Sequence, residues 1–144
     1  CQVFAMGRRS KRPRAGPKNS NGGVKVAEEA EMLQQRVQEE APAPGTLFAK
    51  GSELLFAALP LSNRSQQGLE ASGYSTCTEI QAAALPHALA GRDILGAAKT
   101  GSGKTLAFVV PLLEALFRNS VQTADGLAAV VISPTRELAI QIFE

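Results

Sequence analysis

The stretch GAAKTGSGKT at residues 96–105 decides the fold. It has the spacing of a phosphate-binding loop, G-x-x-x-x-G-K-[ST], with Ala98 in place of the first glycine. A short apolar run precedes the loop and predicts a strand, and the apolar residues 104–118 predict a helix after it. Glycines at 101 and 103 allow successive backbone N–H groups to point inward at the start of that helix. The order strand, loop and helix therefore predicts a nucleotide site.

The loop carries the candidate catalytic residues. Lys104 can reach the β- and γ-phosphates of a nucleotide, and the hydroxyl of Thr105 can ligate Mg²⁺. A simple Gly-Ser-Gly turn with an exposed lysine is the alternative, but it leaves the flanking strand and helix unexplained. The predicted nucleotide-contacting residues of the loop are Ala98, Lys99, Thr100, Gly101, Ser102, Gly103, Lys104 and Thr105.

Helix and strand signals alternate on both sides of this loop. One helix is predicted from a cap at Ser62 to a stop at Gly73, and a second is predicted to begin after Thr78. The apolar run GLAAVVIS at residues 126–133 predicts a second buried strand, and a further helix is predicted to follow it. This order predicts an α/β fold with a parallel sheet. Pro111 inside the helix after the loop is expected to kink it.

Charge is unevenly distributed along the chain. The formal net charge is only +2, but residues 1–27 carry seven basic side chains and no acidic one. This run is rich in Pro, Gly and Ser, which predicts a disordered basic tail over residues 1–25. Such a run is typical of a nuclear or nucleolar targeting signal or of a loose RNA contact. The alternative is a tail that only improves solubility.

Residues 26–45 are predicted to form a short helix and a linker, the latter at the sequence APAPG. Apolar residues recur at helical spacing in the first part of this segment, namely Val26, Ala30, Leu33 and Val37. Residues 46–144 hold the alternating helix and strand signals and predict one globular domain. Its composition fits that class, because 44% of the whole chain is hydrophobic and 19% is charged.

The cysteines and the apolar stretches argue against a disulfide framework, a zinc site and a membrane helix. Cys1 and Cys77 are the two cysteines, too few and too far apart for a disulfide framework or a zinc site, which favours a reducing compartment. The most apolar stretch is interrupted by Pro111 and Glu114 and is shorter than the about 20 residues that a membrane helix needs. No membrane partner is therefore expected. Lone His87, beside a proline in a predicted helix, is interpreted as structural.

Two stretches resemble motifs of a known family. The form A-x-T-G-S-G-K-T at residues 98–105 resembles motif I of superfamily-2 helicases, in which alanine is common at the place of Ala98. Upstream, GYSTCTEIQ at residues 73–81 resembles the Q motif of DEAD-box RNA helicases. The resemblance implies that Gln81 hydrogen-bonds the adenine edge, because an amide offers both a donor and an acceptor. The alternative is that Thr78 and Gln81 form only a capping box at a helix start.

The same resemblance implies a second adenine contact. Phe56 lies seventeen residues before Gly73, where this family places an aromatic ring that stacks on the base. The alternative for a lone phenylalanine is core packing. Phe56, Thr78 and Gln81 are therefore the candidate adenine-site residues. The chain departs from many family members at Cys77, where they have proline.

A third motif lies downstream, where PTRELA at residues 134–139 is identical to motif Ia of the DEAD-box family. The resemblance implies that Pro134, Thr135 and Arg136 contact RNA phosphates at a helix start. The alternative is a plain helix start with Ser133 as cap and Pro134 in the first turn.

Together the motifs imply an ATP-dependent RNA helicase that uses ATP and Mg²⁺. Residues 46–144 would form the N-terminal part of a RecA-like lobe, with translation starting at Met6 and the acidic motif and second lobe lying beyond Glu144. The sequence is most similar to nucleolar members that act on pre-rRNA, so we expect a nuclear protein with pre-rRNA or snoRNA-containing complexes and pre-ribosomal proteins as partners. This piece alone is expected to bind nucleotide weakly at most, without turnover. A P-loop ATPase or DNA translocase without RNA specificity, or a non-catalytic RNA-binding product, are the alternatives.

Overall fold

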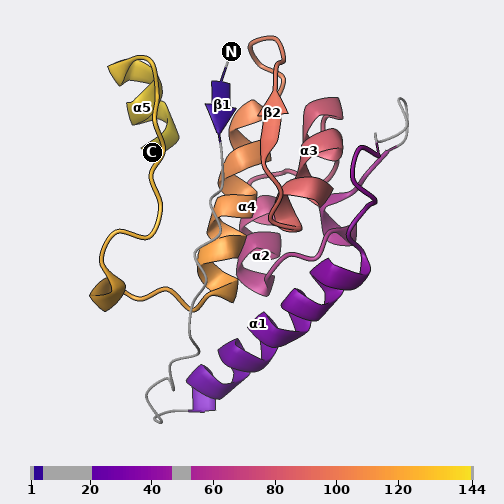
Figure 1. Cartoon of the computed structure of the whole chain (residues 1–144), viewed down its shortest axis with the longest axis vertical. Helices are drawn as coiled ribbons and strands as arrows, with labels where there is room; N and C mark the ends of the chain where they lie inside the picture. The colour runs from indigo at the N-terminus through magenta and orange to yellow at the C-terminus, as the bar shows by residue number, and fades with distance from the viewer. Residues whose placement is uncertain (1, 5–20, 47–52, 144) are drawn as a thin grey trace.

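The computed structural model describes residues 2–4, 21–46 and 53–143, so most of the predicted basic tail lies outside the described residues (Figure 1). In chain order the elements are strand β1 (Gln2–Phe4), helix α1 (Asn21–Glu39), the 3-10 turn η1 (Phe56–Ala58), helices α2 (Asn63–Ala71) and α3 (Glu79–Leu89), strand β2 (Ile94–Gly96), helix α4 (Lys104–Arg118), the 3-10 turn η2 (Thr123–Asp125) and helix α5 (Arg136–Phe143).

Helices α2, α3 and α4 begin where the sequence predicts. Ser62 caps α2 by accepting a hydrogen bond from the backbone N–H of Ser65, and Thr78 precedes the first turn of α3. Helix α4 covers the predicted residues and continues through the buried Pro111 to Arg118. Helices α3 and α4 pack side by side, and β2 lies against α3 (Figure 1). The loop between β2 and α4 is thereby fixed at both ends.

One apolar cluster joins the helices. Its buried members come from α1, η1, α2, α3 and α4 and from the segment before α2, and they are Val37, Phe56, Leu59, Leu61, Leu69, Leu85, Leu89 and Val110. Leu85 of α3 has no solvent exposure at all. Burial of this kind contributes about 1.5–3 kcal/mol for each large aliphatic side chain. The cluster therefore holds together segments that are far apart in the sequence.

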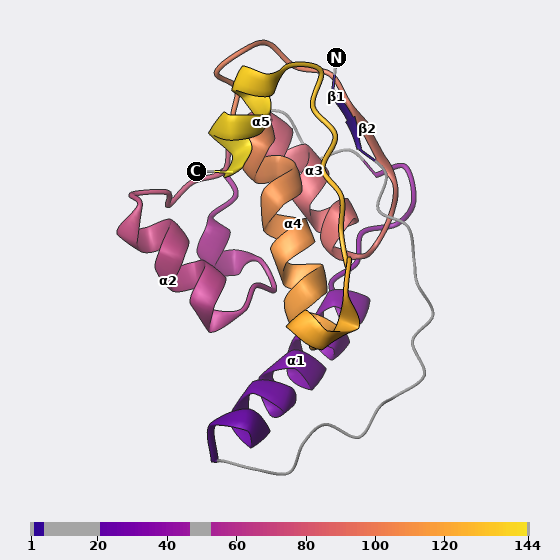
Figure 2. The same ribbon diagram turned by 90° about the vertical axis from the view of Figure 1, so that its left-hand side faces the viewer.

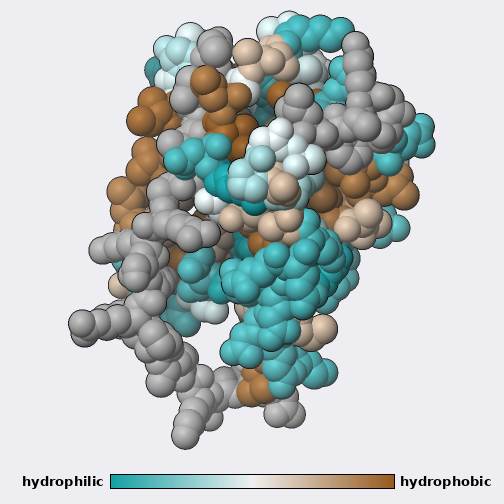
Figure 3. Space-filling view, turned by 45° about the vertical axis from the view of Figure 1, so that its right-hand side comes forward, coloured by the Kyte–Doolittle hydropathy of each residue, from teal (hydrophilic) through white to brown (hydrophobic). Residues whose placement is uncertain are grey.

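Helix α1 packs against α4 and belongs to this core (Figure 2). Ala30, Leu33 and Val37 are buried as predicted, whereas Val26 is 36% exposed. The helix begins at Asn21, five residues before the predicted start, because the apolar stripe marks only the residues that pack. Its outer face is hydrophilic (Figure 3). Neither α1 nor any other helix within the described ranges has the length and hydrophobicity needed to cross a bilayer.

The described residues form no parallel sheet, so that prediction is not confirmed. Strand β2 pairs only with β1, in antiparallel register, with Gln2 opposite Gly96 and Phe4 opposite Ile94. Parallel strands are normally buried on both faces under helices. Leu95 of β2 is 77% exposed, so the face of β2 that carries it has no such cover.

The strand predicted over residues 126–133 is wrong in this structure. These residues have no regular secondary structure and lead to α5, which stands apart from α2, α3 and α4 in Figure 1. Leu127, Val130 and Ile132 are 78%, 64% and 88% exposed. An apolar run of strand length becomes a strand only when neighbouring strands and covering helices accept it. In the described part of the chain, no neighbouring strand and no covering helix lies beside this segment.

Candidate nucleotide-binding site

The glycine-rich loop connects β2 to α4 with two residues in the left-handed region. Gly101 has φ of 74° and Gly103 has φ of 83°, and Gly103 is the N-terminal cap residue of α4. A Cβ atom at Gly103 would lie 2.3 Å from Gln81 Nε2, whereas one at Gly101 would meet nothing within 4 Å. Gly103 is therefore required both by its backbone conformation and by the side chain packed against it.

Gln81 joins the start of α3 to this loop. Its Nε2 donates to the backbone oxygen of Gly103 at 3.0 Å, and its Oε1 accepts from the backbone N–H of Thr78 at 2.9 Å. The Thr78 hydroxyl donates to the backbone oxygen of Ser102 at 2.8 Å. Gln81 is only 2% exposed. The capping contact that the sequence left open is thus present, and the amide also binds the phosphate loop.

Lys104 folds back over its own loop. Its Nζ donates to the backbone oxygens of Ala98 at 2.6 Å and Lys99 at 2.5 Å. The hydroxyl oxygen of Ser102 is buried and has no hydrogen-bond partner among the described residues. A buried hydroxyl without a partner is uncommon in native proteins. The loop therefore holds an ammonium group and an unsatisfied hydroxyl, both of which suit a phosphate ligand.

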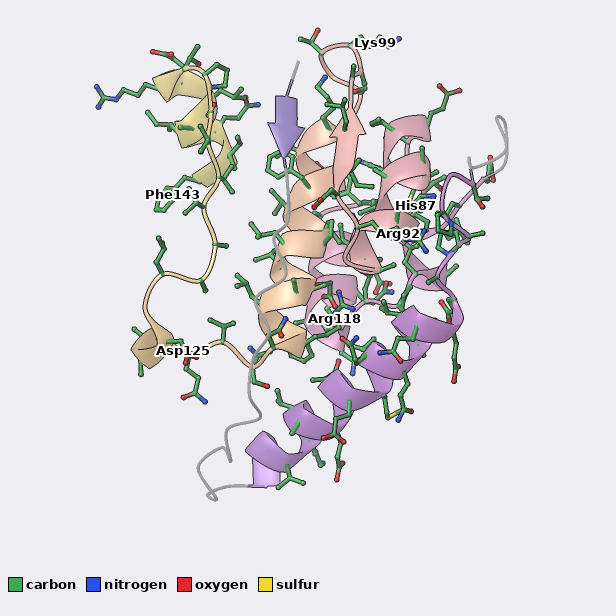
Figure 4. All side chains as sticks on the ribbon, in the orientation of Figure 1. His87, Arg92, Lys99, Arg118, Asp125 and Phe143 are labelled. Carbon is green, nitrogen blue, oxygen red and sulfur yellow. The ribbon has the colours of Figure 1, made fainter. Side chains whose placement is uncertain are left out.

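The other loop residues vary in exposure. Lys99 lies at the tip of the loop and points away from the helices (Figure 4), and Thr100 is exposed as well. Ala98 is half-buried, as is Thr105 in the first turn of α4. In the described parts of the chain, no three His, Cys, Asp or Glu side chains are grouped so as to bind a metal ion. The role of Thr105 as a Mg²⁺ ligand stays a prediction.

Phe56 does not present its ring to solvent in this structure. It is 2% exposed and belongs to the apolar cluster, as the core-packing alternative predicts. Its backbone nevertheless lies beside the Q-motif segment, because its N–H donates to the Ser75 oxygen at 3.0 Å. Likewise the Cys77 N–H donates to the Leu54 oxygen at 2.8 Å. Stacking of Phe56 on a base stays a prediction.

The predicted RNA-contacting residues lie at the start of α5. Pro134, Thr135 and Arg136 are all exposed, and the helix begins at Arg136. Thr135 Oγ1 accepts a 3.3 Å hydrogen bond from the backbone N–H of Leu138. Thr135 is therefore the cap rather than Ser133, because Pro134 precedes the helix instead of opening it. Their contact with RNA stays a prediction.

His87 is structural, as interpreted. One ring nitrogen, Nε2, lies 2.7 Å from the backbone oxygen of Thr46, and the other, Nδ1, lies 2.7 Å from Arg92 Nη1 (Figure 4). A carbonyl can only accept and a guanidinium can only donate, so the ring carries its proton on Nε2. His87 thereby ties α3 to the segment after α1.

Sequence reasoning missed the buried polar group of α4. Glu114 has no solvent exposure, and its carboxylate accepts hydrogen bonds from Ser62 N, Ser62 Oγ and Ser65 Oγ at 3.0, 2.7 and 2.6 Å. Burial lowers the pKa of the nearby Arg118 guanidinium, and the charge of Glu114 partly offsets this effect. A single acidic residue inside an apolar helix was the available signal, since such a residue is buried only when paired or hydrogen-bonded.

Cys77 gives a prediction about pH. Burial raises the pKa of its thiol to about 11. Because the folded state favours the protonated thiol, this contribution to stability is complete below the ordinary thiol pKa of about 8.5 and is lost as the pH rises toward 11. The free energy of unfolding of the unmodified chain, measured with urea, should therefore fall relative to that of Cys77→Ala between pH 8.5 and 10.5. A difference that stays constant over this range would show that the thiol pKa is not raised.

A strand, a glycine-rich loop with left-handed glycines and a helix beginning at Lys104 define a P-loop protein. Residues 78–144 match the family described as DEAD/DEAH box helicase. The chain is 56% identical over 120 residues to the ATP-dependent RNA helicase dbp4 of Sclerotinia sclerotiorum, covering 83% of this chain and 14% of that protein. It is 61% identical over 100 residues to the protein of the same name in Coccidioides immitis, covering 69% of this chain and 12% of that protein.

A third relative matches a larger share of this chain. The ATP-dependent RNA helicase dbp4 of Aspergillus clavatus is 46% identical over 137 residues, which cover 92% of this chain and 17% of that protein. The chain belongs to the DEAD/DEAH-box helicase family, which implies a RecA-like fold for its P-loop region. It spans about a seventh of the length of these curated relatives.

Proposed function

We propose that this chain forms part of the ATP-binding lobe of an ATP-dependent RNA helicase. The observation that carries the proposal is the hydrogen bond between Gln81 Nε2 and the Gly103 oxygen. It places the glutamine expected to bind adenine beside the loop expected to bind phosphates. The family match and the names of the relatives support the same activity. Because the chain spans only part of those relatives, the activity, substrates and partners of the whole protein are all part of the proposal.

In this proposal ATP binds across the start of α4. Lys104 exchanges its two loop carbonyls for phosphate oxygens, because charge-assisted hydrogen bonds between two ionised groups are the stronger ones. The unsatisfied hydroxyl of Ser102 supports a further phosphate contact. Thr105 ligates Mg²⁺, which supplies neutralisation of the phosphate charge. Gln81 binds the adenine edge, and Thr78 holds the helix start beside it.

The RNA side of the proposal rests on the exposed start of α5. Arg136 supplies a permanent positive charge, and Pro134 and Thr135 hold it at a helix N-terminus, which favours a phosphate group. We further propose pre-rRNA or snoRNA-containing complexes as substrates, pre-ribosomal proteins as partners and the nucleolus as the location. The basic run before α1 supports these assignments.

The test is binding of fluorescent ADP and GDP to the 144-residue chain. Lys104→Ala should weaken both nucleotides about 10-fold or more, because a charge-assisted phosphate contact is lost. Gln81→Ala should weaken ADP alone and so remove the preference for adenine. Arg64→Ala, which removes an exposed positive charge on α2, serves as the control and should bind as the unmodified chain does.

Two outcomes would contradict the proposal. Equal binding by Lys104→Ala and Arg64→Ala would mean that the loop does not bind phosphates. An unchanged ADP preference in Gln81→Ala would favour the alternative of a P-loop ATPase that does not read adenine through this glutamine.

A further inference from the structure

A buried carboxylate links the P-loop helix to the start of α2. Glu114 of α4 accepts hydrogen bonds from the backbone and hydroxyl of Ser62 and from the hydroxyl of Ser65. Because Glu114 has no solvent exposure, these bonds are not exchanged with water. The start of α2 is therefore fixed relative to α4.

The residue after Ser65 in α2, Gln66, holds the segment that contains Phe56. Gln66 Nε2 donates to the backbone oxygens of Phe56 at 3.0 Å and Leu59 at 3.3 Å. This amide uses both of its N–H groups on one 3-10 turn. The position of Phe56 is therefore set by α2 as well as by the apolar cluster.

The same segment is bonded to the Q-motif residues, which are bonded to the loop. Phe56 and Leu54 pair with Ser75 and Cys77 through two backbone hydrogen bonds. The Q-motif segment continues to Thr78 and Gln81, whose side chains bind the backbone oxygens of Ser102 and Gly103. Hydrogen bonds thus connect α4 to α2, α2 to η1, and η1 to the segment before α3. The start of α3 is in turn bonded to the loop at the N-terminus of α4.

We propose that Gln66 is a positioning residue for adenine recognition, and that Ser65 anchors it to the P-loop helix through Glu114. The inference rests on the proposed function. Gln66 acts through the Phe56 turn, which sets where the Q-motif segment and Gln81 lie relative to the phosphate loop. No group of Gln66 or Ser65 touches the nucleotide in this proposal. Loss of either contact loosens the adenine side of the site and leaves the phosphate loop in place.

The test compares Gln66→Met with Gln67→Met in the ADP and GDP binding assay. Methionine keeps the length and apolar stem of Gln66 and removes its two donors. Gln67 is the matched control, because it is the neighbouring glutamine on the exposed side of α2. We expect Gln66→Met to lower the preference for ADP over GDP about fivefold, which is the effect of one ordinary hydrogen bond, and Gln67→Met to leave it unchanged. Ser65→Ala should act in the same direction.

A double variant separates positioning from a general loss of stability. In a Gln81→Ala background the adenine contact is already gone, so Gln66→Met should cause no further loss of preference. Unfolding midpoints in urea show whether each variant is folded. An unchanged preference in folded Gln66→Met, or an equal loss with and without Gln81, overturns the inference. A chain that shows no preference for ADP before any substitution overturns the proposed function instead.

Discussion

Gly103→Ala is expected to destabilise the chain by about 3 kcal/mol, against about 1 kcal/mol for Gly101→Ala. Both glycines lie in the left-handed region, with φ of 83° and 74°, so both alanines carry the same backbone cost. Only at Gly103 does the new methyl group meet other atoms, at 2.3 Å from Gln81 Nε2 and 3.1 Å from Thr78 Oγ1. Gln81 must then release the Gly103 oxygen, and Thr78 must release the Ser102 oxygen.

Urea unfolding of both variants, followed by circular dichroism, measures this difference. Gly101→Ala is the matched control, because nothing lies within 4 Å of its added Cβ atom. In the nucleotide assay Gly103→Ala should also lose ADP binding, because the start of α4 and Gln81 move together. Equal unfolding free energies for the two variants would mean that the contact between Gln81 and Gly103 adds nothing to stability.

Local signals predicted the elements that surround this loop. The cap at Ser62, the start of α3 after Thr78 and the full extent of α4 depend on hydrogen bonds within a few residues, which a sequence pattern records directly. The apolar residues Leu33 and Val37 were also predicted to pack, because helical spacing fixes which face they share.

The sheet could not be predicted in the same way. A strand depends on partners that are distant in sequence, and the apolar run at 126–133 carries no information about which partner it has. In the described structure it remains without regular structure and exposed, while β2 pairs with β1, which the sequence did not indicate.

Within the site, the structure tests only one of the two interpretations of Gln81, and its contact with adenine stays a prediction. Gln81 fits both a capping box and an adenine contact, and the structure uses its oxygen for the cap and its nitrogen for the loop. Phe56 fits core packing and base stacking, and the structure shows the first. The two interpretations of each residue cannot be distinguished from sequence, because the same spacing fits both. The partners of Glu114 could not be predicted for another reason, because its three donors lie 49 to 52 residues away along the chain.

Glu114→Ala is expected to cost about 3–5 kcal/mol in the free energy of unfolding, because a hydrogen bond to a charged group contributes about 1.5–3 kcal/mol and a buried donor left without its acceptor costs about 1–3 kcal/mol. The substitution removes the acceptor of the buried Ser62 N–H and of the Ser62 and Ser65 hydroxyls. It also removes the negative charge near Arg118, whose guanidinium is itself partly buried. Ser62 can still cap Ser65, so α2 should shift at its start rather than unfold alone.

Glu70→Ala is the control for this prediction, because Glu70 is exposed on α2 and its loss should change stability by about 0.5 kcal/mol or less. The cost of Glu114→Gln in the free energy of unfolding should lie between the costs of Glu114→Ala and Glu70→Ala. The amide oxygen of the glutamine still accepts a hydrogen bond, whereas its amide nitrogen faces donors. If Glu114→Ala costs no more than Glu70→Ala, α2 is held by the packing of Leu69 in the apolar cluster and by the bond from Asn63 N–H to Glu29 of α1. The buried carboxylate would then have no part in fixing α2 to the P-loop helix, and the positioning of Gln66 would depend on these other contacts of α2.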